Sequence, residues 1–205
     1  MPSLNHKIDF VLLLTATNAN PNGDPLNGNR PREDYEGRGE ISDVCIKRKL
    51  RNRLQDLGAP IFVQSADRSD DGCRSLNERA SAVKDLAELV KSKEADSIEQ
   101  YARVACEKWY DVRAFGQVFA FKGDSVSVGV RGPVSIHQAL SVSPVDIVDQ
   151  QITKSVNSEP TKDGGKSSDT MGMKHFVIFG LYVVKGSVNC QLAEKTGFSD
   201  QDAEL

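Results

Sequence analysis

Residues 42–58 read SDVCIKRKLRNRLQDLG, and they hold the clearest helix signal in the chain. Ser42 is a good N-cap residue, Asp43 stands in the first turn, and Gly58 is a stop signal. The apolar side chains between them recur at helical spacing and form one stripe: Ile46, Leu50, Leu54 and Leu57. The stretch therefore predicts an amphipathic helix anchored by its apolar face.

The same stretch contains five cations and no acid within seven residues, Lys47-Arg48-Lys49-Leu50-Arg51-Asn52-Arg53. The whole chain has a formal net charge of −3, so this block indicates a local anion-binding surface. On a helix, Lys47 and Arg51 lie on one flank of the apolar stripe, and Lys49 and Arg53 lie on the other. We expect these cations to project outward. A solvated positive face is the ordinary alternative, but like charges four residues apart cost a few tenths of a kcal/mol, about 0.2–0.5 per pair. No acid in the block offsets this cost, which favours a polyanionic ligand such as nucleic acid.

Length and composition restrict the class of protein. At 205 residues with 39% hydrophobic content, the chain can bury one substantial core or two small ones. The sequence has neither a transmembrane-length apolar stretch nor the charged and apolar regions of a signal peptide. No C-x-x-C pair occurs among Cys45, Cys73, Cys106 and Cys190. These features predict a cytoplasmic protein with reduced thiols, rather than a disulfide frame or a zinc site.

Along the chain, strand and helix patterns alternate in an order typical of an α+β sheet with helices on one face. The nearly all-apolar residues 8–15 predict a buried strand, and the Gly-, Asn- and Pro-rich residues 18–39 predict a loop. Further elements are predicted by periodicity: a short strand at 61–63, helices over 76–90 and from Asp96 to Trp109, a hairpin of 115–121 with 126–136, and a central strand at 176–184. A polar, poorly ordered stretch is expected at 153–170.

Signals for catalysis are few. The three histidines are far apart in sequence, and none lies in an acid–base or nucleophile signature. Asp24 and Asp34, in the loop that precedes the basic helix, are the only carboxylates to test for RNA cleavage. Residues 67–78 imitate a calcium-binding loop, but Arg74 replaces an apolar position and no entering helix fits before it. We predict no cofactor and no metal site.

The last seven residues, 199–205, begin like a helix, with Ser199 as the cap and acids in the first turn. No apolar stripe follows. We therefore expect a domain that lacks its C-terminal part.

Several motifs, in order, carry a family resemblance. They are residues 10–15, Asn20-Pro21-Asn22-Gly23-Asp24, Gly37-Arg38-Gly39-Glu40-Ile41-Ser42 and Cys45-Ile46-Lys47-Arg48-Lys49-Leu50-Arg51, followed by residues 131–139 and 171–175. Together they resemble the Cas-seven (Cas7) backbone subunit of CRISPR surveillance complexes, of the RAMP superfamily, and in particular its type I-C form. The similarity runs from residue 5 to the end, and family members usually continue further.

The resemblance implies a modified RNA-recognition, ferredoxin-like sheet in a single domain, residues 1–205, with a finger-like insertion at 59–111 and a thumb-like insertion at 141–175. It implies a non-enzymatic subunit that binds CRISPR RNA and lines up with copies of itself along the guide. Target DNA, through the guide, and Cas-five and Cas-eight type subunits would be its other partners. Because the subunit must accept any spacer sequence, it would grip the RNA backbone and leave specificity to base pairing.

Carried onto this chain, the resemblance implies nine RNA-binding residues: Asn20, Arg38, Ser42, Lys47, Arg48, Arg51, Met171, Met173 and Lys174. Two alternatives stay open. Related subunits in other CRISPR types cut bound RNA, so a metal-dependent endoribonuclease using Asp24 is one. An α+β interaction module whose basic helix meets an acidic protein is the other.

Overall fold

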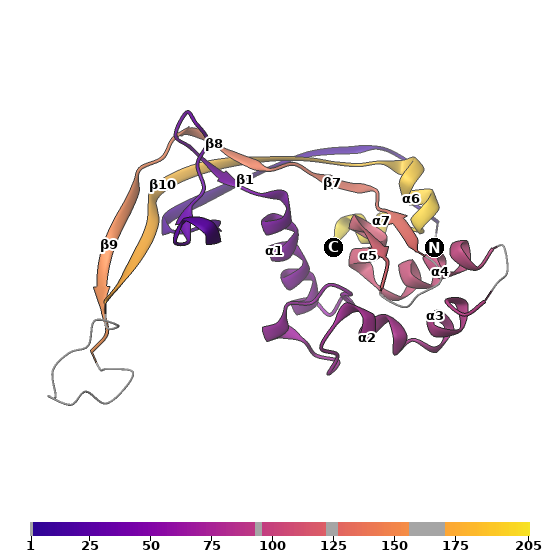
Figure 1. The fold of residues 1–205 in the computed structure, drawn as a ribbon. Coiled ribbons are helices and arrows are strands. Elements are labelled where there is room, and N and C mark those ends of the chain that lie inside the picture. Colours follow the sequence, from indigo (N-terminus) through magenta and orange to yellow (C-terminus); the bar gives the residue numbers. More distant parts are fainter. Residues whose placement is uncertain (1, 93–95, 122–126, 156–170) are drawn as a thin grey trace, which may run out of the picture. The chain divides into compact units, whose positions relative to one another are not determined.

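The computed structural model describes residues 2–92, 96–121, 127–155 and 171–205 and divides into two compact units. Unit 1 comprises Met1–Phe10, Ile46–Ile136 and Gly186–Leu205, and unit 2 comprises Val11–Cys45 and His137–Lys185. Three elements run from one unit into the other: β1 (Ile8–Ala19), α1 (Asp43–Asp56) and β10 (Met171–Val188) (Figure 1).

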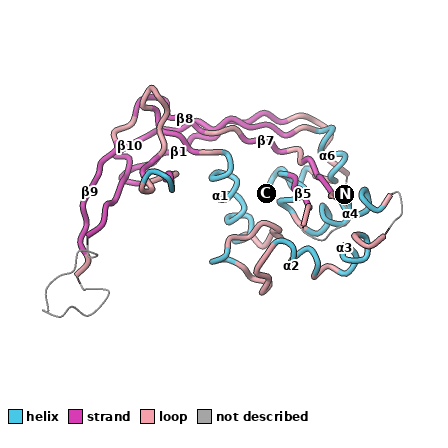
Figure 2. The backbone as a smooth tube through the Cα atoms, in the orientation of Figure 1, coloured by secondary structure: helices cyan, strands magenta, loops and turns pink. Residues whose placement is uncertain are grey.

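Unit 1 is rich in helices, drawn in cyan in Figure 2. Besides most of α1 they are α2 (Leu76–Ser81), α3 (Lys84–Leu89), α4 (Ser97–Lys108), α5 (Tyr110–Phe115), α6 (Cys190–Thr196) and α7 (Asp200–Glu204), with a 3-10 turn, η2 (Ala66–Arg68). An antiparallel hairpin accompanies them, formed by β5 (Gly116–Phe119) and β6 (Val128–Arg131). A further strand, β7 (Val134–Ile136), pairs with the C-terminal end of β10.

Two apolar clusters hold unit 1 together. In the first, the Phe62 ring lies 4.6 Å from the Trp109 ring and 5.0 Å from the Phe119 ring, centroid to centroid. Such tilted aromatic pairs add to the free energy of burying their area. The second cluster gathers residues from both ends of the chain around α1 and α5: Leu4, Leu54, Ile61, Tyr110, Ala114, Val188, Ala193 and Phe198. Helix α1 is thus anchored in unit 1 through Leu54.

Unit 2 is built on an antiparallel sheet in which β10 is central. On one side β10 pairs with β8 (Ala139–Pro144) and with β9 (Ile147–Thr153), while β1 is its neighbour on the other. The outer strand β4 (Arg38–Ile41) pairs with β8. Two short strands, β2 (Gly23–Asp24) and β3 (Arg30–Pro31), enclose the 3-10 turn η1 (Pro25–Asn27).

The α+β class predicted from the sequence is confirmed, and so are several elements. Helix α1 ends two residues before Gly58, and α4 follows Asp96 as expected. The hairpin of β5 and β6 and the central strand β10 are present. At the C-terminal end, Ser199 caps α7 in a capping box with Asp202.

Two predicted elements are wrong, and one observed helix was not predicted. Residues 76–90 form two helices because Val83 between them is extended, with φ −87° and ψ 110°. Residues 61–63 form no strand, since the backbone N–H groups of Phe62 and Val63 donate to a carboxylate instead. Residues Tyr110–Phe115 form α5, and Gly116, with a positive φ of 80°, ends it.

The prediction that residues 8–15 are a buried strand is half wrong. They form a strand, but Val11 and Leu13 are 63% and 62% exposed. An apolar run does not by itself show that both faces of a strand are covered.

The finger-like insertion predicted at 59–111 falls in unit 1, and the thumb-like insertion at 141–175 falls in unit 2, with 156–170 outside the described residues. These boundaries stay predictions. Among the described residues, no helix combines the length and the apolar character needed to cross a membrane.

Candidate nucleic-acid interface

The basic helix α1 has its inner face fixed by a buried ion pair in unit 1. Arg51 Nε donates to Asp111 Oδ2 at 2.8 Å, and the Asp111 side chain is fully buried. The same carboxylate accepts the backbone N–H groups of Phe62, at 2.7 Å, and Val63, at 3.1 Å. The Arg51 guanidinium also lies 5.2 Å from the centre of the Phe115 ring. Arg51 therefore points into the protein and sets the rotation of α1.

Arg48 is also used structurally. Its Nη2 donates to the backbone oxygen of Val63 at 2.6 Å, and its Nη1 donates to Asn52 Oδ1 at 3.3 Å. Burial and the neighbouring Arg51 cation lower the pKa of Arg48 below its ordinary value. The expectation that all the cations of the block project outward is thus wrong for Arg48 and Arg51, because Arg48 bonds to the segment after α1 and Arg51 bonds to Asp111 on α5.

The remaining cations of the block differ in exposure. Lys49 and Arg53 are exposed, and Lys47 is half-buried. Lys49 and Arg53 lie four residues apart, so they are neighbours on the helix surface. The two flanks assigned from periodicity therefore differ. The flank with Arg51 is tied to Asp111, whereas the flank with Lys49 and Arg53, here called the open flank, is exposed.

In unit 2, the N-terminus of α1 is held by Asn22. The backbone N–H and the hydroxyl of Ser42 both donate to Asn22 Oδ1, at 2.8 and 2.9 Å. Ser42 Oγ in turn accepts from the Cys45 N–H at 3.3 Å, as expected for a cap. Ser42 therefore positions α1, and Asn22 is a residue that the sequence analysis missed.

Asn20 and Arg38 lie in unit 2 on different elements. Asn20 belongs to the segment of residues 20–32, which contains β2, η1 and β3, and its Nδ2 donates to the Asn29 backbone oxygen at 2.6 Å. Arg38 on β4 forms an ion pair with Glu36 at 3.0 Å, with both side chains nearly half exposed. An ion pair of this kind leaves Arg38 accessible, since exposed pairs contribute little to stability.

Met171, Met173 and Lys174 all lie on the part of β10 that pairs with β9, here called the β9–β10 hairpin. Alternation along a strand places Met171 and Met173 on one face and Lys174 on the other. The two methionines are 62% and 54% exposed. Lys174 Nζ lies 5.7 Å from the centre of the Phe176 ring.

The carboxylates considered for RNA cleavage are already engaged. Asp24 Oδ1 accepts from the Leu26 N–H and from Arg32 Nη2, both at 3.2 Å. Asp34 Oδ1 accepts the backbone N–H groups of Glu36 and Arg38, at 2.8 and 2.9 Å. Both side chains shape the loop rather than point away from it.

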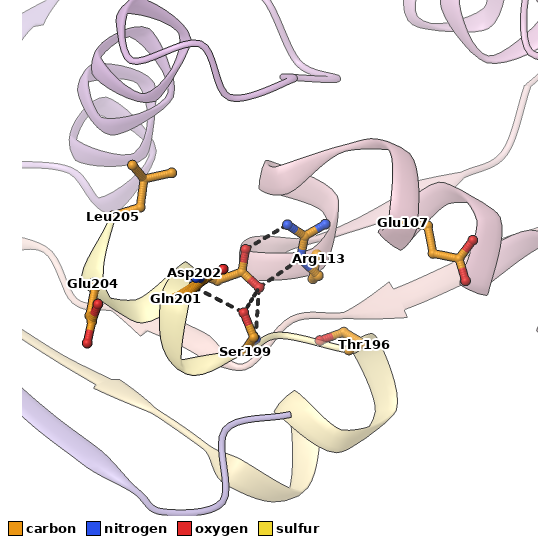
Figure 3. Close-up of a pocket in the computed structure, with 9 residues that line it drawn as sticks. Glu107, Arg113, Thr196, Ser199, Gln201, Asp202, Glu204 and Leu205 are labelled. Carbon is orange, nitrogen blue, oxygen red and sulfur yellow. Dashed lines mark hydrogen bonds and ion pairs between the residues drawn. The ribbon is translucent and has the colours of Figure 1, made fainter. Parts of the chain in front are cut away.

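A separate pocket of about 750 Å³ lies in unit 1 at the end of the chain (Figure 3). At its wall Arg113 on α5 donates to both carboxylate oxygens of Asp202 on α7, at 3.1 and 2.7 Å. Burial opposes ionisation of Asp202, but the hydrogen bonds from Arg113 and Ser199 outweigh it and lower its pKa. This pocket contains none of the predicted RNA-binding residues.

Sequence reasoning also missed Asp111 in unit 1 and the group of Arg30, Asp149 and His175 in unit 2. Asp111 sits in α5, between the helix predicted to end at Trp109 and the predicted hairpin, where no element was predicted. Asp149 and His175 meet only through the register of β9 and β10, which neither local sequence contains.

Comparison with known proteins places the chain in a family. A model of the family described as CRISPR-associated protein Cas7 matches residues 6–205. A CRISPR-associated protein Cas7 from Haloferax volcanii (strain DS2) is 29% identical over 225 aligned residues, which cover 100% of this chain and 62% of the relative.

A chain of a solved structure, "CRISPR RNA-guided surveillance complex, pre-nicking", has the same fold. It superposes with a TM-score of 0.57 at 21% identity, over 97% of this chain and 65% of that chain. The chain thus spans less than two thirds of the length of either relative. The family match over nearly all of its residues shows that the chain belongs to the Cas7 family.

Proposed function

We propose that this chain is a CRISPR RNA-binding backbone subunit of a type I-C surveillance complex in the cytoplasm. The proposal rests on the two different orientations of the cations on α1. Arg48 and Arg51 are locked inward, while Lys49 and Arg53 stand exposed on the opposite flank. Membership of the Cas7 family and the fold shared with a surveillance-complex chain support it.

The arrangement suits contacts to an RNA backbone. Lys49 and Arg53 repel each other on the bare helix, and phosphates between them would remove that repulsion. Phosphate contacts position a strand without reading its sequence, so a guide of any sequence can be held. The subunit itself does no chemistry in this proposal. It holds the guide, and base pairing with target DNA supplies the specificity.

Several copies of the subunit would line up along one guide RNA, together with Cas-five and Cas-eight type subunits. Ser42, Asn20, Arg38, Lys47, Met171, Met173 and Lys174 complete the proposed RNA-binding set. Arg48 and Arg51 belong to it as residues that orient the helix.

The test is the salt dependence of binding to a fluorescein-labelled single-stranded RNA. Each phosphate contact contributes about −0.7 to the slope of log K against log salt. The double variant Lys49→Ala with Arg53→Ala should therefore weaken binding and flatten the slope by about 1.4. Lys84→Ala with Arg103→Ala removes the same charge from exposed positions on α3 and α4 and should leave the slope nearly unchanged. Equal slopes in both double variants would remove α1 from the interface.

The endoribonuclease alternative is not favoured by the geometry, because the Asp24 carboxylate already serves η1 and Arg32. It has a direct test. Incubation of the purified protein with guide RNA, complementary RNA and magnesium should leave the RNA intact. Regular cuts that vanish in Asp24→Ala would establish the nuclease.

The acidic-partner alternative makes the opposite prediction about assembly. A protein that stays monomeric when guide RNA is added, and that does not bind the labelled RNA, would support a protein-interaction module.

A further inference from the structure

Three segments of unit 2 meet at the Asp149 carboxylate. Asp149 on β9 lies directly opposite His175 on β10, and His175 Nδ1 is 2.7 Å from Asp149 Oδ1. Arg30 on β3, 119 residues away in sequence, forms an ion pair with the same oxygen. One side chain therefore joins both strands of the β9–β10 hairpin to the 20–32 segment.

The 20–32 segment is braced internally and approaches the hairpin closely. Asn20 Nδ2 donates to the backbone oxygen of Asn29, the residue next to Arg30. Gly28 has a left-handed backbone, φ 57°, and a Cβ atom there would lie 3.8 Å from His175 Nε2. A shift of Arg30 would therefore carry the rest of the segment with it.

The same segment also holds the N-terminus of α1 within unit 2. Asn22, next to β2, accepts both hydrogen bonds from Ser42. The 20–32 segment thus has several attachments in unit 2, among them Asn22 to the helix N-terminus, Arg32 to β4 and Arg30 to the hairpin.

The charges at the junction favour an ionised Asp149. The hydrogen bond from His175, and then the Arg30 cation, lower the pKa of Asp149 below its ordinary value. The His175 and Arg30 side chains are 16% and 27% exposed, whereas that of Asp149 is 47% exposed. A partly exposed ion pair contributes little to overall stability, so its larger effect is on the orientation of the parts it joins.

We infer that Asp149 is a positioning residue for RNA binding: through Arg30 and His175 it fixes the β9–β10 hairpin on the 20–32 segment. The hairpin carries Met171, Met173 and Lys174, and the segment carries Asn20. The inference rests on the proposed function. It adds a residue that contributes to RNA binding although its own charge repels RNA.

The negative charge of Asp149 makes the inference testable, because a purely electrostatic effect and a positioning effect predict opposite changes in RNA affinity. Removing a carboxylate near bound RNA reduces electrostatic repulsion and should raise affinity slightly. A positioning role predicts the opposite, since a loosened hairpin must be ordered again when RNA binds. We expect Asp149→Ala to weaken RNA binding by about fivefold, the lower end of measured coupling between sites.

The experiment compares variants of the 205-residue chain by fluorescence anisotropy with a fluorescein-labelled single-stranded RNA. Asp146→Ala is the matched control, because Asp146 is exposed, lies just before β9, and its carboxylate has no bond to the described residues. The charge swap Arg30→Asp with Asp149→Arg keeps the net charge and the ion pair, and should restore most of the affinity. Hydrogen–deuterium exchange without RNA should be faster in Asp149→Ala at residues 147–153 and 171–177.

Each outcome decides something different. Asp149→Ala that binds RNA as tightly as Asp146→Ala, with or without a loosened hairpin, overturns the positioning role and leaves the proposed function standing. A charge swap that binds no better than Asp149→Ala also overturns it. A wild-type protein that does not bind the RNA overturns the proposed function and this inference with it, even if the exchange data show the junction.

Discussion

Replacing Asp111 by alanine is the sharpest test of how α1 is held. The fully buried carboxylate accepts hydrogen bonds from Arg51 and from the backbone of Phe62 and Val63. Alanine leaves a mostly buried guanidinium and two backbone N–H groups without an acceptor. The substitution therefore disturbs the link between α1, α5 and the segment after α1.

The expected cost follows from the type of interaction. Removing one partner of a buried ion pair destabilises a protein by about 3–5 kcal/mol, because the other charge stays buried. A domain of this kind is stable by only about 5–15 kcal/mol in total. Asp111→Asn, which keeps one acceptor oxygen, should cost less and fold where the alanine variant is marginal.

Urea unfolding followed by tryptophan fluorescence measures the effect. The chain has one tryptophan, Trp109, which is buried beside Phe62, so its emission reports directly on the affected region. The unfolding free energy should fall in the order wild type, Asp111→Asn, Asp111→Ala. Glu107→Ala, an exposed acid on α4, should stay within about 0.5 kcal/mol of wild type.

A loss of less than about 1 kcal/mol in Asp111→Ala would contradict a buried, structurally required ion pair. It would mean that the ion pair is no stronger than a surface pair and that Arg51 is free to leave it for a ligand.

Two further predictions concern stability. Burial, and then the Asp202 charge, raise the pKa of Tyr110 to about 12, and its hydroxyl donates to the Asp202 backbone oxygen at 2.5 Å. The neutral phenol therefore stabilises the fold below pH 10, and this stabilisation is lost as the pH rises from 10 to 12, by at most about 1.4 kcal/mol per pH unit. Tyr110→Phe should show a shallower alkaline decline in urea unfolding, and parallel pH curves would contradict this. Second, a Cβ atom at Gly39 would lie 2.4 Å from Tyr182 Oη, so Gly39→Ala should cost about 1–3 kcal/mol. Adding Tyr182→Phe should recover part of that loss, since the Tyr182 hydroxyl is buried without a hydrogen-bond partner among the described residues. A double variant no more stable than Gly39→Ala would count against the clash.

What the sequence predicted well was local. The cap at Ser42, the apolar spacing of Ile46 and Leu54, and the cap at Ser199 each depend on neighbours within a few residues, and each is confirmed. The Cas7 family was also identified correctly from ordered motifs.

The sequence predicted poorly the tertiary contacts between residues that are far apart along the chain. Helical spacing places Arg51 on a flank of α1, but only its contact with Asp111, sixty residues later, shows that the flank faces inward. The Asp149 junction depends in the same way on strand register and on a partner 119 residues away. A basic block in a sequence therefore does not separate cations that bind a ligand from cations that build the site.

The central claim is that the open flank of α1 and the β9–β10 hairpin hold RNA. The most direct measurement is photo-crosslinking of the protein to 4-thiouridine-substituted single-stranded RNA, with the crosslinked peptides identified by mass spectrometry. We expect crosslinks in peptides that contain residues 47–53 and 171–174. Crosslinks confined to α2, α3 and α4, or none at all under conditions where the protein retains RNA, would contradict it.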